Sequence, residues 1–187
     1  MKIKRISDQR YLENGDIDCN VLFAGMEAPL PYTASASDTV ETGRQIWQAL
    51  QSGKWGAIAP FIVTPELVAA AKDVKKREIE AWRTEQESQP FTFEWNGRRW
   101  NAGPDSMARL YPLVMASKFG AARGVMTWGD ADNQQVKLAV PDLEELAAAM
   151  AQAIIDRNDE IYRRQREMKE ALNALEDLKS IRMLSIE

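Results

Sequence analysis

The 187-residue sequence contains no histidine. Histidine is the commonest general base and the commonest zinc ligand, so its absence excludes Ser-His and Cys-His nucleophile pairs and histidine-bound zinc. The only cysteine is Cys19, and no disulfide framework can form within the chain. These two shortages narrow the available chemistry and fit a protein of the reducing cytoplasm.

Long apolar runs and an excess of positive charge are lacking as well. No run approaches the ~18 apolar residues of a membrane span, and the basic N-terminal residues are not followed by the apolar core of a signal peptide. The 24 Lys and Arg residues against 28 Asp and Glu residues give a net charge of −4. Proteins that neutralise phosphates need a basic face. We therefore expect no membrane partner and no nucleic-acid partner.

Motifs for ions and cofactors are also missing. The sequence has neither a phosphate-binding loop nor a G-x-G-x-x-G fingerprint. Residues 14–18 and 130–133 share the first spacings of a calcium loop, but both lack its central glycine and its final glutamate. Carboxylate pairs such as Glu144–Glu145 fall in helical segments and are typical of solvated faces. We expect no catalytic residue, no cofactor and no metal.

The strongest structural signal is a helix predicted over residues 141–180. Pro141 is followed by acidic residues that favour a helix N-terminus, and neither Gly nor Pro occurs after it. The stripe of apolar residues on this helix contains Ala147, Ile154, Ile161, Met168, Leu172 and Leu175. The flanking positions become polar in the middle, at Arg157, Asn158, Arg164 and Gln165. Such a stripe predicts one of two arrangements. Either several chains form a helical bundle, whose register the polar residues fix, or the helix packs within its own chain.

Turn signals divide the rest of the chain. We expect a small mixed unit over residues 1–63, in which Asn14-Gly15 turns between two strands, and a charged connector helix over 64–89. The second unit, over 90–187, has the order hairpin, helix, hairpin, long helix, which is ββαββα-like. Its two hairpins are predicted to pair into one small sheet. The predicted fold class is α+β.

Three tryptophans, Trp95, Trp100 and Trp128, fall on the predicted hairpins. An exposed tryptophan cluster would be a contact site for sugar or protein, whereas a buried cluster would line the small core of the unit. On the first interpretation, the candidate partner-binding residues are these tryptophans together with Ile154, Ile161, Met168, Leu172 and Leu175 of the long helix.

Two stretches resemble proteins of tailed bacteriophages. The C-terminal part contains a W-N-G-x-x-W hairpin, then D-S-x-x-R-L, then T-W-x-D-A-D-N-Q before a helix that begins with an acid and Leu. This order resembles a domain of uncharacterised function found in phage tail-region proteins. The N-terminal stretches RYLENGDIDCNVLF, PYTASASDTVETGRQIW and GKWGAIAPF resemble the front ends of phage tail fibre assembly proteins.

The resemblance implies a role in building or decorating a tail fibre, and it implies no catalytic residue. Three hypotheses follow. The chain is a tail fibre assembly chaperone or fibre-associated tail protein that binds a fibre protein in the host cytoplasm, either leaving or staying in the virion tail. Alternatively, it is a self-associating structural adaptor of the virion tail and forms a homo-oligomer. The third hypothesis, a carbohydrate-acting enzyme with two carboxylates, has the least support in the sequence.

Overall fold

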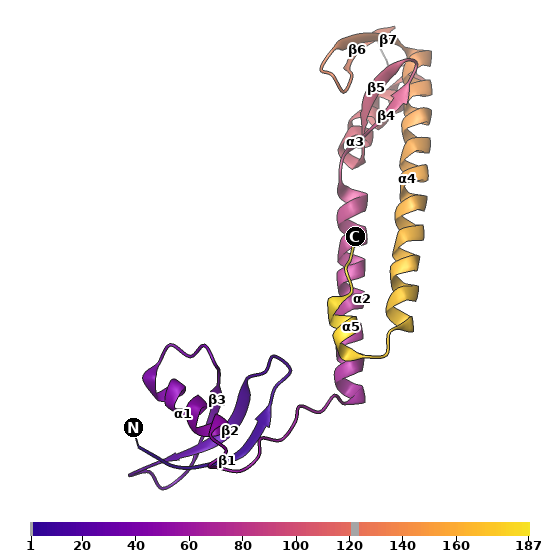
Figure 1. Ribbon diagram of the computed structural model, residues 1–187. Coiled ribbons are helices and arrows are strands. Elements are labelled where there is room, and N and C mark those ends of the chain that lie inside the picture. Colours follow the sequence, from indigo (N-terminus) through magenta and orange to yellow (C-terminus); the bar gives the residue numbers. More distant parts are fainter. Residues whose placement is uncertain (1, 121–123) are drawn as a thin grey trace. The chain divides into compact units, whose positions relative to one another are not determined.

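The computed structural model describes residues 2–120 and 124–187 and divides the chain into two compact units, Met1–Thr64 and Pro65–Glu187 (Figure 1). Both units combine helices with small antiparallel sheets, so the predicted α+β class is confirmed. The helix predicted as a connector over 64–89 packs inside the second unit instead of standing between two units.

The first unit is an antiparallel three-stranded sheet with one helix packed against it. Its elements are β1 (Ile3–Tyr11), β2 (Ile17–Phe23), β3 (Leu30–Ala34) and α1 (Glu41–Gln51). Every second residue of β2 is buried, which is the pattern of a strand with one face on a core. The unit has one strand more than the predicted hairpin. The extra strand, β3, lies at the sheet edge, where Pro31 is tolerated although it lacks an N–H.

The second unit is built on two long antiparallel helices, with two β-hairpins and a shorter helix at one end (Figure 1). Its elements are α2 (Pro65–Ser88), β4 (Phe91–Trp95), β5 (Arg98–Ala102), α3 (Pro104–Lys118), β6 (Val125–Gly129), β7 (Gln135–Ala139), α4 (Val140–Ala174) and α5 (Leu178–Met183). The hairpins β4-β5 and β6-β7 form two separate sheets. The prediction that they pair into one sheet is therefore wrong.

Both hairpins pack on one core. Its buried residues come from β5, α3, β7 and the first turns of α4, and they are Trp100, Ala102, Leu110, Leu138, Leu143, Leu146 and Met150. The alternation of the strands explains this arrangement, because one face of each hairpin is apolar and the other polar. The start of α4 therefore anchors both hairpins to the helical part of the unit.

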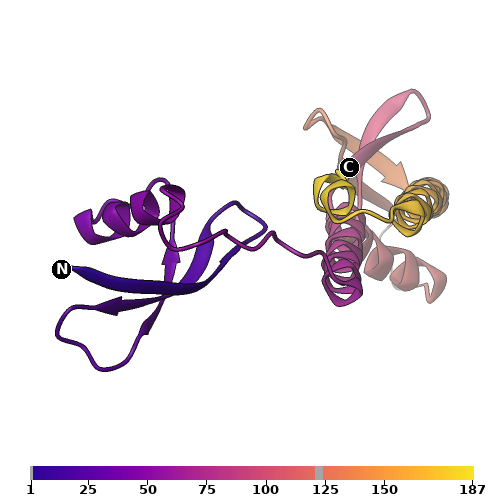
Figure 2. The same ribbon diagram turned by 60° about the horizontal axis from the view of Figure 1, so that its bottom comes forward.

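The long helix ends earlier than predicted. α4 stops before Leu175, which is extended (φ −79°, ψ 133°), and the chain turns back into α5. The Asp177 carboxylate accepts a hydrogen bond from the Ser180 N–H at 2.8 Å and caps α5. Figure 2, which looks almost along the helices, shows α5 beside α2. Burial of Leu178 and Ile181 in this contact stabilises the turn against the helix propensity of the stretch.

The apolar stripe of α4 packs within the chain. Ile161, Met168 and Leu172 are buried in the contacts that α4 makes with the rest of the second unit, mainly with α2. Ile79 of α2 is fully buried as well. Of the two interpretations of the stripe, packing within the chain is the one that the structure shows, and these residues need no second molecule to cover them.

One polar side chain is buried between α2 and α4. Gln165 is 1% exposed; its Nε2 donates to Glu80 Oε2 at 2.9 Å, and its Oε1 accepts from Arg83 Nη1 at 3.5 Å. Lys169 pairs with the same carboxylate and, with the Gln165 bond, lowers the pKa of Glu80. A buried amide without partners costs about 1–3 kcal/mol, so sliding α4 along α2 is disfavoured. The polar middle of the stripe thus fixes the register inside the chain.

Arg157 of α4 binds the end of α2. Its Nη1 donates to the Gln89 carbonyl at 2.8 Å and its Nη2 to the Gln86 carbonyl at 3.0 Å. The guanidinium also lies 4.6 Å from the centre of the Phe91 ring. A cation at a helix C-terminus is favourable because the last carbonyls carry a partial negative charge. Arg157 therefore joins its own helix, α4, to the end of α2 and to the first residue of β4.

We expect Arg157→Ala to lower the free energy of unfolding by about 1–2 kcal/mol, because two hydrogen bonds to carbonyls and the contact with the ring are lost. The measurement is urea unfolding followed by far-UV circular dichroism, which reports the helices. Arg163→Ala is the matched control, since Arg163 is 70% exposed and forms a surface ion pair with Glu160 of its own helix. Equal shifts of the urea midpoint in the two variants would contradict the assignment.

Candidate binding site where the two hairpins meet

The turns of the two hairpins are set by local sequence. Asn96 and Gly97 have φ angles of 51° and 72°, as a two-residue type I′ turn requires, and Trp95 pairs with Arg98. In the second hairpin the Asp130 N–H donates to the Gln134 carbonyl at 3.0 Å, and Asn133 has a φ of 63°. Asparagine and glycine tolerate this left-handed conformation better than other residues do.

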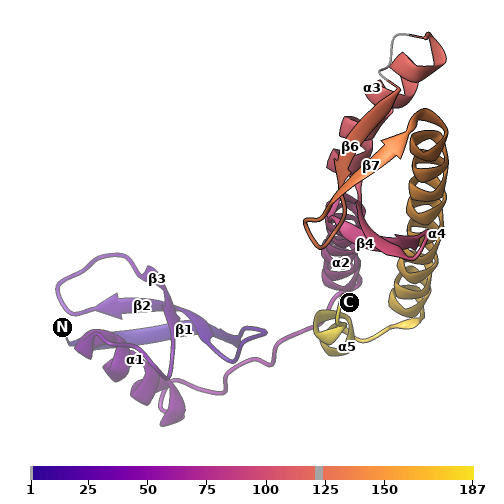
Figure 3. The ribbon, with the colours of Figure 1, turned by 90° about the horizontal axis from the view of Figure 1, so that it is seen from above.

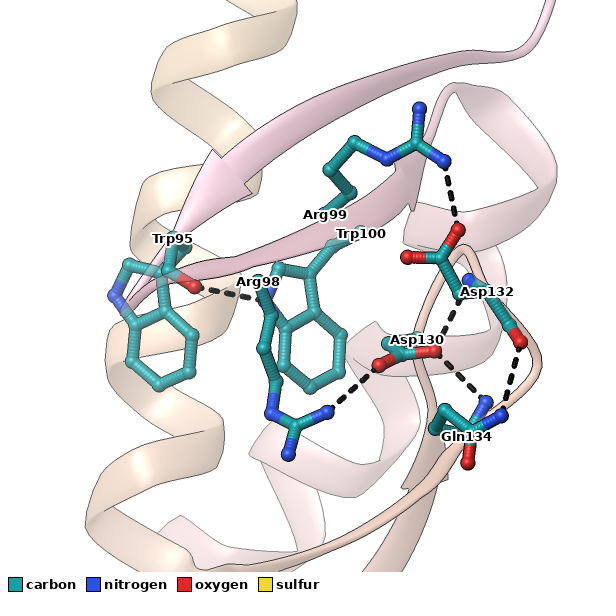
Figure 4. A network of polar contacts seen from close by, with 7 residues as sticks. All are labelled: Trp95, Arg98, Arg99, Trp100, Asp130, Asp132 and Gln134. Carbon is teal, nitrogen blue, oxygen red and sulfur yellow. Dashed lines mark hydrogen bonds and ion pairs between the residues drawn. The ribbon is translucent and has the colours of Figure 1, made fainter.

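The two hairpins touch where the β6-β7 turn meets β5, in a contact that we call the hairpin junction. It consists of Arg98 and Arg99 of β5 and Asp130, Ala131 and Asp132 of the turn (Figure 4). Arg98 Nη1 lies 2.9 Å from Asp130 Oδ2, and Arg99 Nη2 lies 2.7 Å from Asp132 Oδ1. The Ala131 N–H donates to the Arg99 carbonyl at 2.9 Å. Two ion pairs and one backbone hydrogen bond thus hold the hairpins together.

Asp130 is the buried member of this junction, with its side chain 3% exposed. One of its carboxylate oxygens accepts from the Gln134 N–H at 2.8 Å and from the Asp132 N–H at 3.0 Å, and the other accepts from Arg98. The Gln134 N–H contributes most to lowering the pKa of the Asp130 carboxyl, with Arg98 and the Asp132 N–H acting in the same direction. Asp130 therefore stays charged and serves to order the turn.

The tryptophans do not form an exposed cluster. Trp100 is 1% exposed, and its Nε1 donates to the Trp95 carbonyl at 3.0 Å (Figure 4). The rings of Trp95 and Trp100 meet edge to face, with centres 5.9 Å apart. Trp95 and Trp128 are partly buried against the core of the second unit. The core interpretation is thus correct for Trp100, which is not available to a partner.

The helix residues predicted as partner contacts are also mostly covered. Ile161, Met168 and Leu172 are buried within the single chain, which leaves little of these side chains for a partner to contact. Ile154 is partly buried against the core of the second unit, and Leu175 is partly buried after the end of α4. The apolar stripe located the buried face of the helix but could not tell whether the same chain or another one covers it.

Two shallow pockets flank Asp130. One, of about 300 Å³, is called the β6 pocket here and is lined by Asn101, Ser106, Arg109, Thr127, Trp128, Gly129, Asp130 and Asn133. The other, of about 440 Å³, is lined by Glu94, Asn96, Gly97, Arg98, Arg99, Asp130, Asp132 and Gln134. Both pockets are open and mainly polar in their lining residues. They suit recognition of a polar chain segment better than enclosure of an apolar ligand.

Sequence reasoning missed most of these residues. Arg98 and Arg99 resemble a solvated basic pair, and the aspartates at 130 and 132 resemble an ordinary turn. Their pairing joins positions more than thirty residues apart, for which local spacing gives no signal. One signal was available in the sequence: the first hairpin motif carries two arginines, and the second carries two aspartates.

Within residues 2–120 and 124–187, no three His, Cys, Asp or Glu side chains gather as a metal site would need. Cys19 is buried, and burial raises the pKa of its thiol to about 11, so it is protonated at neutral pH and a poor nucleophile. None of the helices in this part of the chain is both long enough and apolar enough to cross a membrane.

A comparison with protein families matches residues 70–182 to the model of DUF4376, a domain of unknown function. This match covers more than half of the chain and includes both hairpins, α3 and α4. Searches of curated proteins and of solved structures found no match.

We expect Asp130→Asn to lower the melting temperature at neutral pH and to matter less in acid. Because the folded pKa of Asp130 lies below its ordinary value of 3.8, its stabilisation is present above that value and disappears as the pH falls through the folded pKa. The measurement is the melting temperature of both proteins between pH 7 and pH 2. Asp132→Asn removes an exposed charge from the same turn and controls for net charge. A difference between wild type and Asp130→Asn that stays constant with pH would contradict the assignment.

Proposed function

The chain belongs to the DUF4376 family of domains of unknown function, and we propose that it acts by binding another protein. In this proposal it is a tail fibre assembly chaperone, or a fibre-associated tail protein, of a tailed bacteriophage. It works in the host cytoplasm during assembly, where it binds a fibre protein.

The observation that carries the binding function is the hairpin junction. Arg98 and Arg99 belong to the W-N-G-x-x-W stretch, and Asp130 and Asp132 belong to the T-W-x-D-A-D-N-Q stretch. Two motifs that lie apart in the sequence therefore meet in one contact, and their carboxylates are occupied by hydrogen-bond donors. Such side chains hold a surface in one shape, which suits recognition, because a catalytic acid or base must be free to exchange a proton.

The link to tail fibres comes from the resemblance of these motifs to phage tail-region proteins. This resemblance implies a trimeric, elongated fibre, and we infer that its chains expose apolar surface and strand edges until all three chains have assembled. Exposed edges and apolar surfaces aggregate. A protein that covers such surfaces on a fibre chain would raise the yield of soluble trimers without turning over any substrate.

A second function, self-association as a structural adaptor of the virion tail, is favoured by one observation. Ile155 and Tyr162 of α4 are 53% and 50% exposed and lie seven residues apart. This spacing places them on one side of the helix. Two copies could bury these side chains against one another, whereas the inner stripe of α4 is already covered.

Co-expression tests the first function. We expect the tail fibre protein encoded in the same genome to be more soluble and more fully trimeric with this chain than alone, and the two proteins to co-purify. Mass spectrometry of purified particles then shows whether the chain stays in the virion tail. A fibre whose solubility and trimer content are unchanged, with no complex, would remove the assembly function from consideration.

Light scattering of the isolated chain tests the second function. If α4 mediates self-association, wild type forms a defined oligomer, and Ile155→Glu shifts it toward monomer because a charge would be buried in the contact. Glu167→Gln, at an exposed position on the same helix, is the control. A wild-type protein that is monomeric at all concentrations would rule out the adaptor function in this form.

A further inference from the structure

The hydrogen-bond pattern of the second hairpin leaves one edge of β6 unpaired. In an antiparallel pair, residues alternate between those whose backbone groups bond the partner strand and those whose groups point away. Asp130 bonds Gln134 across the turn, so Trp128 and Met126 bond β7. The N–H and C=O groups of Thr127 and Gly129 therefore point away from β7.

The same reasoning applies to β5. The two-residue turn makes Trp95 and Arg98 a hydrogen-bonded pair, so the backbone groups of Arg99 and Asn101 point away from β4. The Arg99 carbonyl accepts the Ala131 N–H. Asn101 lines the β6 pocket together with Thr127 and Gly129. The outward edges of β5 and β6 thus both border this pocket, and Asp130 of the hairpin junction lines it as well.

The outer edges of β1, β3, β4 and β7 are protected. In the first unit, β1 exchanges backbone hydrogen bonds with Ala59, and β3 contains Pro31. In the second unit, β4 and β7 both contact α4, and each carries a charged residue, Glu94 and Lys137 respectively. Coverage, proline and charge are the usual means by which proteins blunt strand edges.

Within residues 2–120 and 124–187, β6 lacks these protections. Its sequence, Val-Met-Thr-Trp-Gly, contains neither a charge nor a proline. Figure 3 shows β7 leading toward α4, with β6 on the other side of the hairpin. A neutral, β-prone strand with outward backbone groups is a template for an added strand.

The charge beside the edge indicates what kind of segment would be added. Arg109 of α3 lines the β6 pocket, and its Nε donates to the Asp105 carbonyl at 3.3 Å. Within residues 2–120 and 124–187, no carboxylate pairs with the Arg109 guanidinium. Asp130, the acidic residue that lines this pocket, is already bonded by Arg98 and two backbone N–H groups. The pocket therefore offers a cation and amide groups to an incoming acidic side chain.

We propose that an extended acidic segment of the partner protein binds along the free edge of β6, adding a strand to the β6-β7 sheet and placing a carboxylate on Arg109. This inference rests on the proposed function, since it names how the fibre protein is held. The backbone of Thr127 and Gly129 supplies the affinity, and Arg109 supplies the preference for acid.

The test uses two prolines placed opposite each other. Thr127 and Lys137 face each other in the register, and neither N–H is used in the β6-β7 pair. Thr127→Pro removes an N–H from the free edge, whereas Lys137→Pro removes one from the edge beside α4, at a similar cost to the hairpin. Binding is measured by isothermal titration with the tail fibre protein encoded in the same genome. We expect Thr127→Pro to weaken binding about tenfold or more and Lys137→Pro to leave it nearly unchanged.

Two further measurements define the mode of binding. Arg109→Glu should weaken fibre binding at least as much as Thr127→Pro, while Arg109→Lys should retain most of it. Hydrogen exchange of the Thr127 and Gly129 amides should slow when the fibre protein is bound, because both groups become hydrogen-bonded. Unchanged exchange at these amides in a formed complex would overturn the inference, even if a variant failed to fold.

The outcomes separate the inference from the function on which it rests. Wild-type protein that does not bind the fibre would overturn both. Fibre binding that survives Thr127→Pro would overturn the edge-binding inference alone and leave the assembly function standing. If Thr127→Pro instead converts an oligomer to a monomer and leaves fibre binding intact, the edge binds a second copy of this chain, which also overturns the inference.

Discussion

The contact between α2 and α4 is the constraint on which the second unit depends. Apolar residues give it most of its stability, but they would allow the helices to slide by a turn. Gln165 prevents this, because its amide finds Glu80 and Arg83 in only one register. Arg157 then fixes the end of α2 and, through Phe91, the start of β4. The position of the first hairpin therefore follows from the register of the helices.

The second hairpin is positioned from the other side. β7 runs directly into α4, and the Asp142 carboxylate accepts from the Ala139 N–H at 2.9 Å at this transition. The first hairpin follows α2 and contacts α4, and the second leads directly into α4, so the packing of α2 on α4 determines where the two hairpins meet. The junction of Arg98 and Arg99 with the Asp130 turn closes this arrangement, so the shape of the candidate site is a consequence of helix packing.

Local signals predicted the elements well and their partners poorly. Asn96-Gly97 marked the first turn of the second unit, and the apolar stripe marked the buried face of α4. The sequence could not show that α2 covers this stripe, because a charged helix with few apolar residues resembles a solvated connector. Ile79, which is fully buried, is the residue that contradicts that interpretation. The candidate site depends on charges brought together by the fold, so Arg109 and Asp130 carried no local signal of their roles.

The separation of the two hairpins is itself informative. If β5 and β6 paired fully, the second unit would bury more backbone and leave fewer strand edges open. Instead, the Asp130 turn rather than β6 bonds to β5, and the side chains of Ser106 and Arg109 border the gap. The ion pairs of the junction hold the turn in this place, because moving β6 onto β5 would separate Asp130 from Arg98 and Asp132 from Arg99. The polar contacts of the junction therefore keep β5 and β6 apart. This separation leaves the outer edge of β6 open, as the proposed addition of a strand from another chain requires.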